Sequence, residues 1–242
     1  MKKIIKFLFK ILQTPFIIKD YLSYLKKDKN QRFNLKIKDF YPQIKDKTIK
    51  TGFDRHYVYH TAWAARKIKE INPIKHIDIS SSLYFSGILS SFIDIDFYDY
   101  RPADLHLSGL KSLEGNLYNL PFESNSLKSI SCMHTVEHIG LGRYGDTIDP
   151  EGDLRAISEL KRVVEPKGNL LFVVPIGRAK IEFNAHRVYS YEQIISYFDK
   201  FTLKEFSLIP ESADKGGLII NADPKLVEAE KYACGCFWFI KN

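Results

Sequence analysis

Hydrophobic and polar positions in the middle of the chain switch between a helical period and short apolar runs. From Phe53 to Ile71 apolar residues recur at helical spacing, and Asn72-Pro73 stops that pattern. Short apolar runs follow at Ile74–Ile79 and Phe92–Tyr98, with a helix-like stretch from Tyr84 to Ser91 between them. The order predicts a strand, a helix and a parallel strand joined by a right-handed crossover.

Three later segments continue the alternation. The pattern predicts a strand at Ser129–Met133, a helix at Asp153–Val164 and a buried strand at Asn169–Val174 that Pro175 closes. Alternating strands and helices are typical of an α/β protein with a mostly parallel sheet. A chain of 242 residues has room for one such core and a short appendage.

The first 27 residues have a different pattern. Lys2, Lys3, Lys6 and Lys10 fall on one stripe of a helix, and apolar side chains cover the rest. Lysines interrupt every apolar run before the ~20 residues that a membrane-spanning helix needs. Residues 1–27 are therefore predicted to form an amphipathic helix in the membrane interface, ended or kinked at Pro15. The alternative is a helix that packs on the protein's own core or on a partner subunit.

The distribution of charge also separates the N-terminal part of the chain from the rest. Residues 1–50 contain 14 lysines and arginines against 4 aspartates, whereas the whole chain carries +7, so the remainder sums to −3. Residues 28–52 are Lys-rich and polar, which predicts a linker before an α/β domain at 53–242. A negative core argues against nucleic acid as a partner, and the basic leader suits an anionic membrane surface. We expect a cytoplasmic protein, peripheral at the inner face of the membrane.

Three cysteines, Cys132, Cys234 and Cys236, are too few and too odd in number for a disulfide framework, which favours a reducing compartment. The Cys-x-Cys pair points to one face of a predicted strand. Structural zinc usually needs four ligands, and no other Cys or His lies nearby in the sequence. No metal site is assigned there.

The first two predicted strands end in acidic and small polar residues that are suited to binding a nucleotide. The first strand ends with Asp78 and Ile79, and the serines Ser80, Ser81 and Ser82 follow it. Asp99 comes at the end of the second strand, 21 positions after Asp78. In βαβ nucleotide sites, an acidic residue about 20 positions past a small-residue turn holds ribose hydroxyls. The spacing predicts such a site at the carboxyl ends of these strands.

Several sequence blocks resemble known proteins. The blocks Leu120–Leu127, Thr135–His138 and Glu159–Gly168 resemble, in order and spacing, the middle of class I S-adenosylmethionine methyltransferases. More narrowly, residues 53–242 resemble an uncharacterised methyltransferase-like family, first described from nematode proteins of unknown function and also found in bacteria among surface-glycan genes. This narrower resemblance rests on Gly140–Asp146, Asp149–Asp153, Asn184–Arg187 and Tyr232–Trp238.

The resemblance implies a Rossmann-like fold with a seven-stranded, mostly parallel sheet and an antiparallel last strand, here Cys234 to Ile240. It also implies S-adenosylmethionine as cofactor. Active methyltransferases have an acidic-x-Gly-x-Gly-x-Gly turn, because glycine lets the backbone approach the cofactor. Serines replace those glycines here, so the alternative is a scaffold that keeps the fold without the cofactor. The implied cofactor-binding residues are Asp78, Ser80, Ser82, Asp99, Asn116 and Leu117, with the Asn116 carbonyl in place of the usual acidic contact to adenine.

The segment His134-Thr-Val-Glu137-His138 also matches H-x-x-E-H, a zinc protease pattern. That pattern needs both histidines on one face of a sustained helix, whereas this segment follows a strand and runs into glycines. In the methyltransferase interpretation it lies beside the transferred methyl, which makes His138 or Glu137 a candidate general base for a substrate hydroxyl. The alternative is that Glu137 orients the local backbone and His138 is a packed polar residue.

The loop Gly140–Asp153 is unusually rich in glycine and acidic residues. Loops at the carboxyl ends of parallel strands bind ligands, so we expect it to form one acceptor pocket with His138 and the Asn184–Arg187 segment. It could hold sugar hydroxyls, or Mg²⁺ through carboxylates. The alternative is an ordinary loop in which Pro150 and Asp153 start the next helix. Candidate catalytic residues are Asp146 and His186, and candidate substrate-binding residues are Arg143, Tyr144, Asp149, Asp153, Asn184 and Arg187.

Together these features predict a methyltransferase-like enzyme that methylates a hydroxyl of a surface glycan or nucleotide-linked sugar. One alternative is a sugar-transferring or sugar-modifying enzyme on the same fold. Another is a noncatalytic, membrane-associated assembly subunit with an eroded cofactor site.

Overall fold

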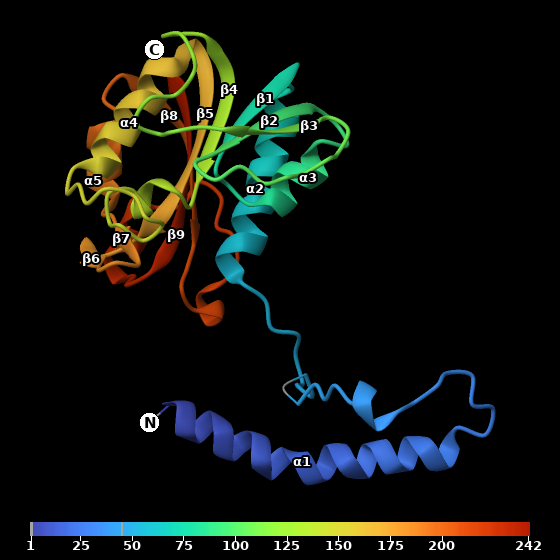
Figure 1. Cartoon of the computed structure of the whole chain (residues 1–242). Coiled ribbons are helices and arrows are strands. Elements are labelled where there is room, and N and C mark those ends of the chain that lie inside the picture. The colour runs from blue at the N-terminus through green and yellow to red at the C-terminus, as the bar shows by residue number, and fades with distance from the viewer. Residues whose placement is uncertain (1, 45) are drawn as a thin grey trace. The chain divides into compact units, whose positions relative to one another are not determined.

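The structure is a computed structural model that describes the backbone of residues 2–44 and 46–242, and the side chains of 15–44 and 46–242. The chain divides into two compact units, Met1–Phe53 and Asp54–Asn242. Figure 1 shows the long helix of the first unit and the α/β architecture of the second.

The N-terminal unit contains the helix α1 (Lys2–Lys27) and a short 3-10 helix, η1 (Ile37–Asp39). Because α1 continues through Pro15, the helix does not end there, and the alternative of a kink at Pro15 stays a prediction. The rings of Tyr21 and Phe40 meet edge to face with centroids 5.4 Å apart, and Lys47 pairs with Asp20 at 2.8 Å. The segment after α1 therefore folds back onto the helix.

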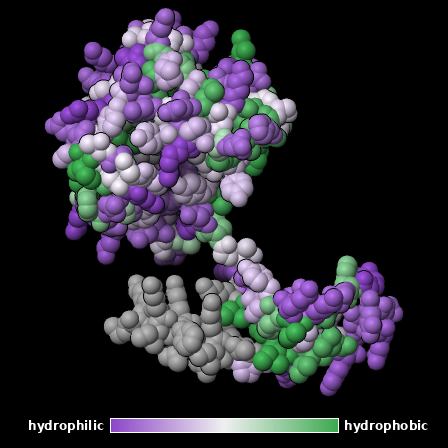
Figure 2. All heavy atoms as spheres, viewed as in Figure 1, coloured by the Kyte–Doolittle hydropathy of each residue, from purple (hydrophilic) through white to green (hydrophobic). Residues whose placement is uncertain are grey.

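Hydrophobic side chains gather beside charged ones on the described part of this unit (Figure 2). Among the described residues, no helix is both long and apolar enough to cross a bilayer. The predicted stripe of Lys2, Lys3, Lys6 and Lys10 lies outside the described side chains.

The second unit is built around a seven-stranded sheet with the order β3-β2-β1-β4-β5-β9-β8. Strand β9 runs antiparallel to both of its neighbours, and every other pairing in this sheet is parallel. This arrangement confirms the predicted seven-stranded, mostly parallel sheet with an antiparallel last strand. The strands are β1 (Lys75–Ile79), β2 (Asp94–Asp99), β3 (Leu110–Glu114), β4 (Leu127–Met133), β5 (Val164–Ile176), β8 (Phe201–Ile209) and β9 (Ala233–Lys241).

Helices cover both faces of the sheet (Figure 1). Successive side chains of β5 alternate between two cores: Leu170 and Phe172 pack with one pair of helices, and Leu171 and Val173 with the other. A strand buried on both faces reads as a continuous apolar run, which explains the pattern in this segment. The helices are α2 (Arg55–Ile71) and α3 (Leu83–Leu89) on one face, and α4 (Gly152–Val163) and α5 (Tyr191–Tyr197) on the other.

Local signals place several element ends close to where the sequence predicts them. Asp54 caps α2 by accepting a hydrogen bond from Tyr57 N at 3.1 Å, and Asn72 ends the helix with a φ of 49°. Strand β5 passes the predicted stop at Pro175, because pairing with β9 extends to Ile176. A short hairpin of β6 (Lys180–Glu182) and β7 (His186–Val188) was not anticipated.

The order of the strands reverses at β1, which pairs with β2 on one side and β4 on the other. In open α/β sheets, ligands bind outside the carboxyl ends of the strands at such a switch point. The carboxyl ends of β1, β2 and β4 therefore mark the edge where a site is expected.

Candidate functional site

A cavity of about 280 Å³ lies at this edge of the sheet. Its lining comes from the ends of β1 and β2, the segment after β3 and the loop after β4. It brings together seven residues that the sequence singled out, although they are up to 66 positions apart: Ser80, Asp99, Asn116, Leu117, His138, Tyr144 and Asp146.

The turn after β1 keeps a glycine-like backbone without glycine. Ser80 has a φ of 53°, in the left-handed region that glycine adopts at little cost. Its N–H and hydroxyl both donate to Tyr98 O, at 2.8 and 3.1 Å, and its carbonyl accepts from the Thr135 hydroxyl at 3.0 Å. These bonds stabilise the conformation, so only the serine side chain narrows the space that a glycine would leave.

Asp99 and Asn116 also line the cavity. Asp99 Oδ1 accepts from Arg101 N at 2.8 Å, and Asn116 Oδ1 accepts from Tyr118 N at 2.9 Å. These bonds fix a carboxylate at the end of β2 and an amide after β3. This placement agrees with the expected ribose and adenine contacts, which remain predictions.

Asp78 does not lie in the cavity, in contrast to the prediction. It is fully buried, and its carboxylate accepts from the Ser131 hydroxyl at 2.6 Å and from the Ser86 hydroxyl. Burial raises the Asp78 pKa to about 6, although these hydroxyls act to lower it. Asp78 therefore ties β1 to β4 and α3. Ser82 is likewise displaced, because it occupies the N-cap position of α3 and lines a separate surface depression.

His138 ends the one-turn 3-10 helix η2 (Val136–His138) and lines the cavity. Its Nδ1 lies 2.6 Å from Ala185 O, which only accepts, and 3.2 Å from Arg143 Nη1, which only donates. The shorter contact favours a proton on Nδ1. Burial lowers the His138 pKa, opposed by Glu137, whose Oε1 is 3.8 Å from Nε2. The imidazole is therefore neutral near pH 7, with an unprotonated Nε2 that can accept a proton.

Glu137 is 1% exposed and does not line the cavity, so its predicted role as a base that touches the acceptor is not supported. Its Oε1 is 2.8 Å from His134 Nδ1, and burial raises its pKa to about 7. Because η2 is a single 3-10 turn, the two histidines do not share the face of a helix, as a zinc protease would require. The cavity does include His134, whose only sequence signal was the H-x-x-E-H match.

Asp146 shapes the glycine-rich loop. Its carboxylate accepts from the backbone N–H groups of Gly140, Gly142 and Tyr144 at 2.7, 3.3 and 3.2 Å, and the first two bonds share one oxygen. A Cβ at Gly140, where φ is 79°, would overlap Asp149 O. The contacts indicate that Asp146 holds the loop in place, and they do not support the predicted catalytic role.

Arg187 and two loop aspartates lie outside the cavity, which corrects their assignment to the acceptor. Arg187 is 5% exposed; it donates to Ile139 O at 2.6 Å and lies 3.5 Å from Asp153. Asp153 accepts from the Tyr189 hydroxyl at 2.9 Å, and Asp149 pairs with Arg155 at 3.3 Å. These side chains fasten the loop to the sheet. With Asp146 also engaged, the acidic cluster offers no support for Mg²⁺.

The remaining candidates lie around His138. The His186 ring is 6.4 Å from the His138 ring but packs against Tyr232 at 4.8 Å, and neither it nor Asn184, in the exposed β6–β7 turn, lines the cavity. Arg143 donates to Ala185 O at 2.9 Å. The cavity therefore brings His138, Tyr144 and Asp146 together, with Arg143 nearby, and the other residues of the predicted common pocket lie outside it. That this space takes the acceptor stays a prediction.

Comparison with known proteins gives this arrangement a context. Residues 117–209 match the model of a family described as Caenorhabditis protein of unknown function, DUF268. No curated protein matches the chain. Similar solved structures include the MccD protein, with 15% identity over 76% of this chain and 97% of that one and a TM-score of 0.52. An S-adenosylmethionine-dependent methyltransferase from Thermotoga maritima is 14% identical, with 77% of this chain and 91% of that chain covered and a TM-score of 0.50. The YcgJ protein from Bacillus subtilis is 13% identical, with 76% of this chain and 99% of that chain covered and a TM-score of 0.51.

The fold is that of the class I methyltransferases. The resemblance to class I methyltransferases is confirmed at the level of the fold. The narrower resemblance is confirmed over residues 117–209, which include the glycine-rich loop and end with strand β8, whereas Tyr232–Trp238 lies outside the match. Identities this low show a shared fold, on which unrelated chemistries can be built.

Proposed function

We propose that this protein is a S-adenosylmethionine-dependent methyltransferase that acts on a hydroxyl of a glycan or nucleotide-linked sugar. The observation that supports this most is that one cavity joins the Ser80 turn, Asp99 and Asn116 to His138. Residues suited to the cofactor and a residue suited to proton transfer thus share one space at the switch point of the sheet.

The residues that line the cavity suit the cofactor in kind. Asp99 would hold the ribose hydroxyls, Asn116 and the buried Leu117 would contact adenine, and the Ser80 backbone would face the methionine portion. At about 280 Å³ the cavity is slightly smaller than most ligand sites, which span about 300–1,000 Å³. A tight fit is expected where serines replace glycines. When bound, S-adenosylmethionine supplies an electrophilic methyl group on sulfonium.

His138 would act on the acceptor. Its Nε2 would accept the proton of the acceptor hydroxyl, and the rate would come mainly from positioning the acceptor beside the cofactor. At the rim of the cavity, Tyr144 is 42% exposed and has the guanidinium groups of Arg101 and Arg143 at 4.8 and 5.0 Å from its ring centre. A cationic and aromatic rim suits an acceptor that carries phosphate, such as a nucleotide-linked sugar.

We expect Asp99→Ala to weaken S-adenosylmethionine binding by ~1.5–3 kcal/mol, because it removes charge-assisted hydrogen bonds to the ribose. Titration calorimetry measures this directly. Asp104→Ala is a matched control, since Asp104 has a 95% exposed side chain and should leave the affinity unchanged. Equal affinity in Asp99→Ala and the unmodified protein would contradict the ribose assignment. No binding by the unmodified protein would favour the sugar-transferring enzyme or the noncatalytic subunit.

We also propose that the N-terminal unit binds an anionic membrane surface, which would bring the enzyme to the inner face of the membrane. In the described part of α1, Phe16, Leu22 and Leu25 are exposed apolar residues, and Lys19 and Lys26 add positive charge beside them. Apolar and basic side chains on one exposed helix are typical of interfacial helices.

Deleting residues 1–27 should abolish cosedimentation with anionic liposomes. Each basic residue near such a surface contributes ~1 kcal/mol, so binding by the full chain should weaken with added salt and on neutral liposomes. Binding that survives the deletion would instead favour α1 as a helix that packs on protein.

A further inference from the structure

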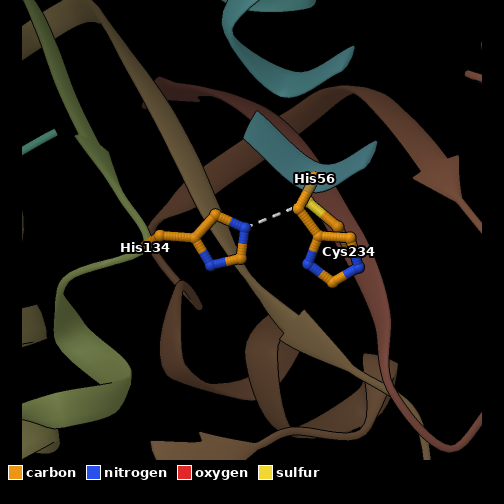
Figure 3. A group of neighbouring side chains, drawn as sticks. All are labelled: His56, His134 and Cys234. Atoms are coloured by element: carbon orange, nitrogen blue, oxygen red, sulfur yellow. Dashed lines mark hydrogen bonds between the residues drawn. The ribbon is translucent and has the colours of Figure 1, made fainter. Parts of the chain in front are cut away.

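Three side chains that commonly bind metal ions meet beside the cavity (Figure 3). His56 comes from the first turn of α2, His134 follows β4 and Cys234 lies in β9. Figure 3 shows them pointing toward one another. One ligand atom from each lies within 4.8 Å of the others, and His134 Nε2 is 3.4 Å from Cys234 Sγ. All three cysteines of the chain are free, so this thiol is available.

Glu137 fixes the orientation of His134. Its carboxylate accepts the N–H of His134 Nδ1 at 2.8 Å, so the lone pair of Nε2 points to Cys234 and His56. A carboxylate behind a histidine is the usual support of a metal-bound imidazole. The other oxygen of Glu137, Oε2, is buried and has no hydrogen-bond partner among the described residues. A cation on His134 would offset the cost of burying this carboxylate.

Among the described residues, three side chains place ligand atoms close enough together to share one ion, and other rings pack around them. The rings of His56 and His134 lie nearly parallel with centroids 5.4 Å apart, and the buried His60 ring meets that of His134 edge to face at 5.0 Å. The ring of His56 stacks on Tyr232 with centroids 5.0 Å apart, and Tyr57 stacks on His134 at 5.5 Å. These aromatic rings flank the cluster. His134 also lines the cavity, which places the cluster next to the space that contains His138.

We propose that His56, His134 and Cys234 bind one transition-metal ion of the zinc type, with Glu137 as the residue that positions His134. Thiolate and imidazole ligands favour zinc, and three protein ligands with one open position are typical of zinc sites that take part in chemistry. Tetrahedral bonds of about 2.0–2.3 Å put ligand atoms roughly 3.3–3.8 Å apart, which the His134–Cys234 separation already matches. The half-buried His56, near the start of α2, has to move by about 1 Å. The site does not depend on methyl transfer.

Titration of the metal-free full chain with Co²⁺ tests the site. We expect one Co²⁺ per chain, with the visible absorption of tetrahedral Co²⁺ and a near-ultraviolet thiolate-to-metal charge-transfer band, both lost when Zn²⁺ displaces the ion. Cys234→Ser should abolish the charge-transfer band. Cys132→Ser is the matched control, because Cys132 is equally buried but packs in the core on the other face of the sheet. Glu137→Gln should keep the band and weaken affinity ~10–100-fold.

Each variant is checked for folding by circular dichroism and thermal unfolding. His56→Ala, at the half-buried start of a helix, is the variant least expected to disturb the core and should bind Co²⁺ weakly without the tetrahedral spectrum. The proposal is overturned if Co²⁺ gives no charge-transfer band with the unmodified chain. It is also overturned if Cys132→Ser loses the band as fully as Cys234→Ser, or if folded His56→Ala binds Co²⁺ with the spectrum and affinity of the unmodified chain.

Discussion

Replacing His138 with alanine should lower methyl-transfer turnover by ~10²–10⁴ and leave the affinity for S-adenosylmethionine nearly unchanged. The expectation rests on its unprotonated Nε2, since Nδ1 is engaged with Ala185 O, and on its place in the same cavity as Asp99. Turnover with nucleotide-linked sugars and calorimetry with the cofactor separate the two effects. His106→Ala, on a 93% exposed side chain, is the matched control.

The pH profile provides a second readout for the same residue. Burial lowers the His138 pKa below its ordinary value of 6.5, with Arg143 and His134 acting in the same direction and Glu137 opposing them. The rings of His186 and Tyr144 also face it. Because the neutral form accepts the proton, turnover should stay level from pH 8 to about 6.5 and fall only as the pH drops further, through the lowered pKa. The same acidic limb in His138→Ala would assign the base to another residue.

Replacing Arg187 with alanine should lower the free energy of unfolding by ~3–5 kcal/mol. The change leaves the buried Asp153 carboxylate without its cation and the carbonyls of Ile139 and Pro150 without their donor. Urea unfolding followed by circular dichroism measures the loss. We expect little direct effect on acceptor affinity, because Arg187 lies outside the cavity.

Two variants sharpen this test. Arg187→Lys should recover part of the stability, since it restores the charge but not the planar fork that reaches several oxygens. Arg143→Ala removes an exposed arginine from the same neighbourhood and should cost no more than ~1 kcal/mol. A stable Arg187→Ala protein with weakened acceptor binding would restore Arg187 to the acceptor site.

Much of the fold could be predicted because its signals are local. Asp54 and Asn72 bound α2 by bonds within one or two turns, and the apolar run of β5 reflects burial on both faces. The carboxyl ends of neighbouring parallel strands must meet at one edge, so residues that follow these strands could be predicted to lie near one another. Ser80, Asp99 and His138 do line one cavity. Strand β3 and the β6–β7 hairpin were not predicted, because their sequences are short and show no clear alternation of apolar and polar residues.

Only the tertiary structure decided what each side chain near that edge does. Side chains alternate between the two faces of a strand and fill whatever space packing leaves, so residues close together in the chain separate. Asp78 is buried while Ser80 lines the cavity, and Arg187 enters the core. Conversely, Cys234 appears isolated from histidine in the sequence, yet His134 lies 3.4 Å away across 100 positions. The sequence thus determined which edge of the sheet carries the site, because the local alternation of strands and helices predicts parallel strands whose carboxyl ends lie at one edge. The contacts that give each residue its role are long-range, so they exist only once the sheet and helices have packed.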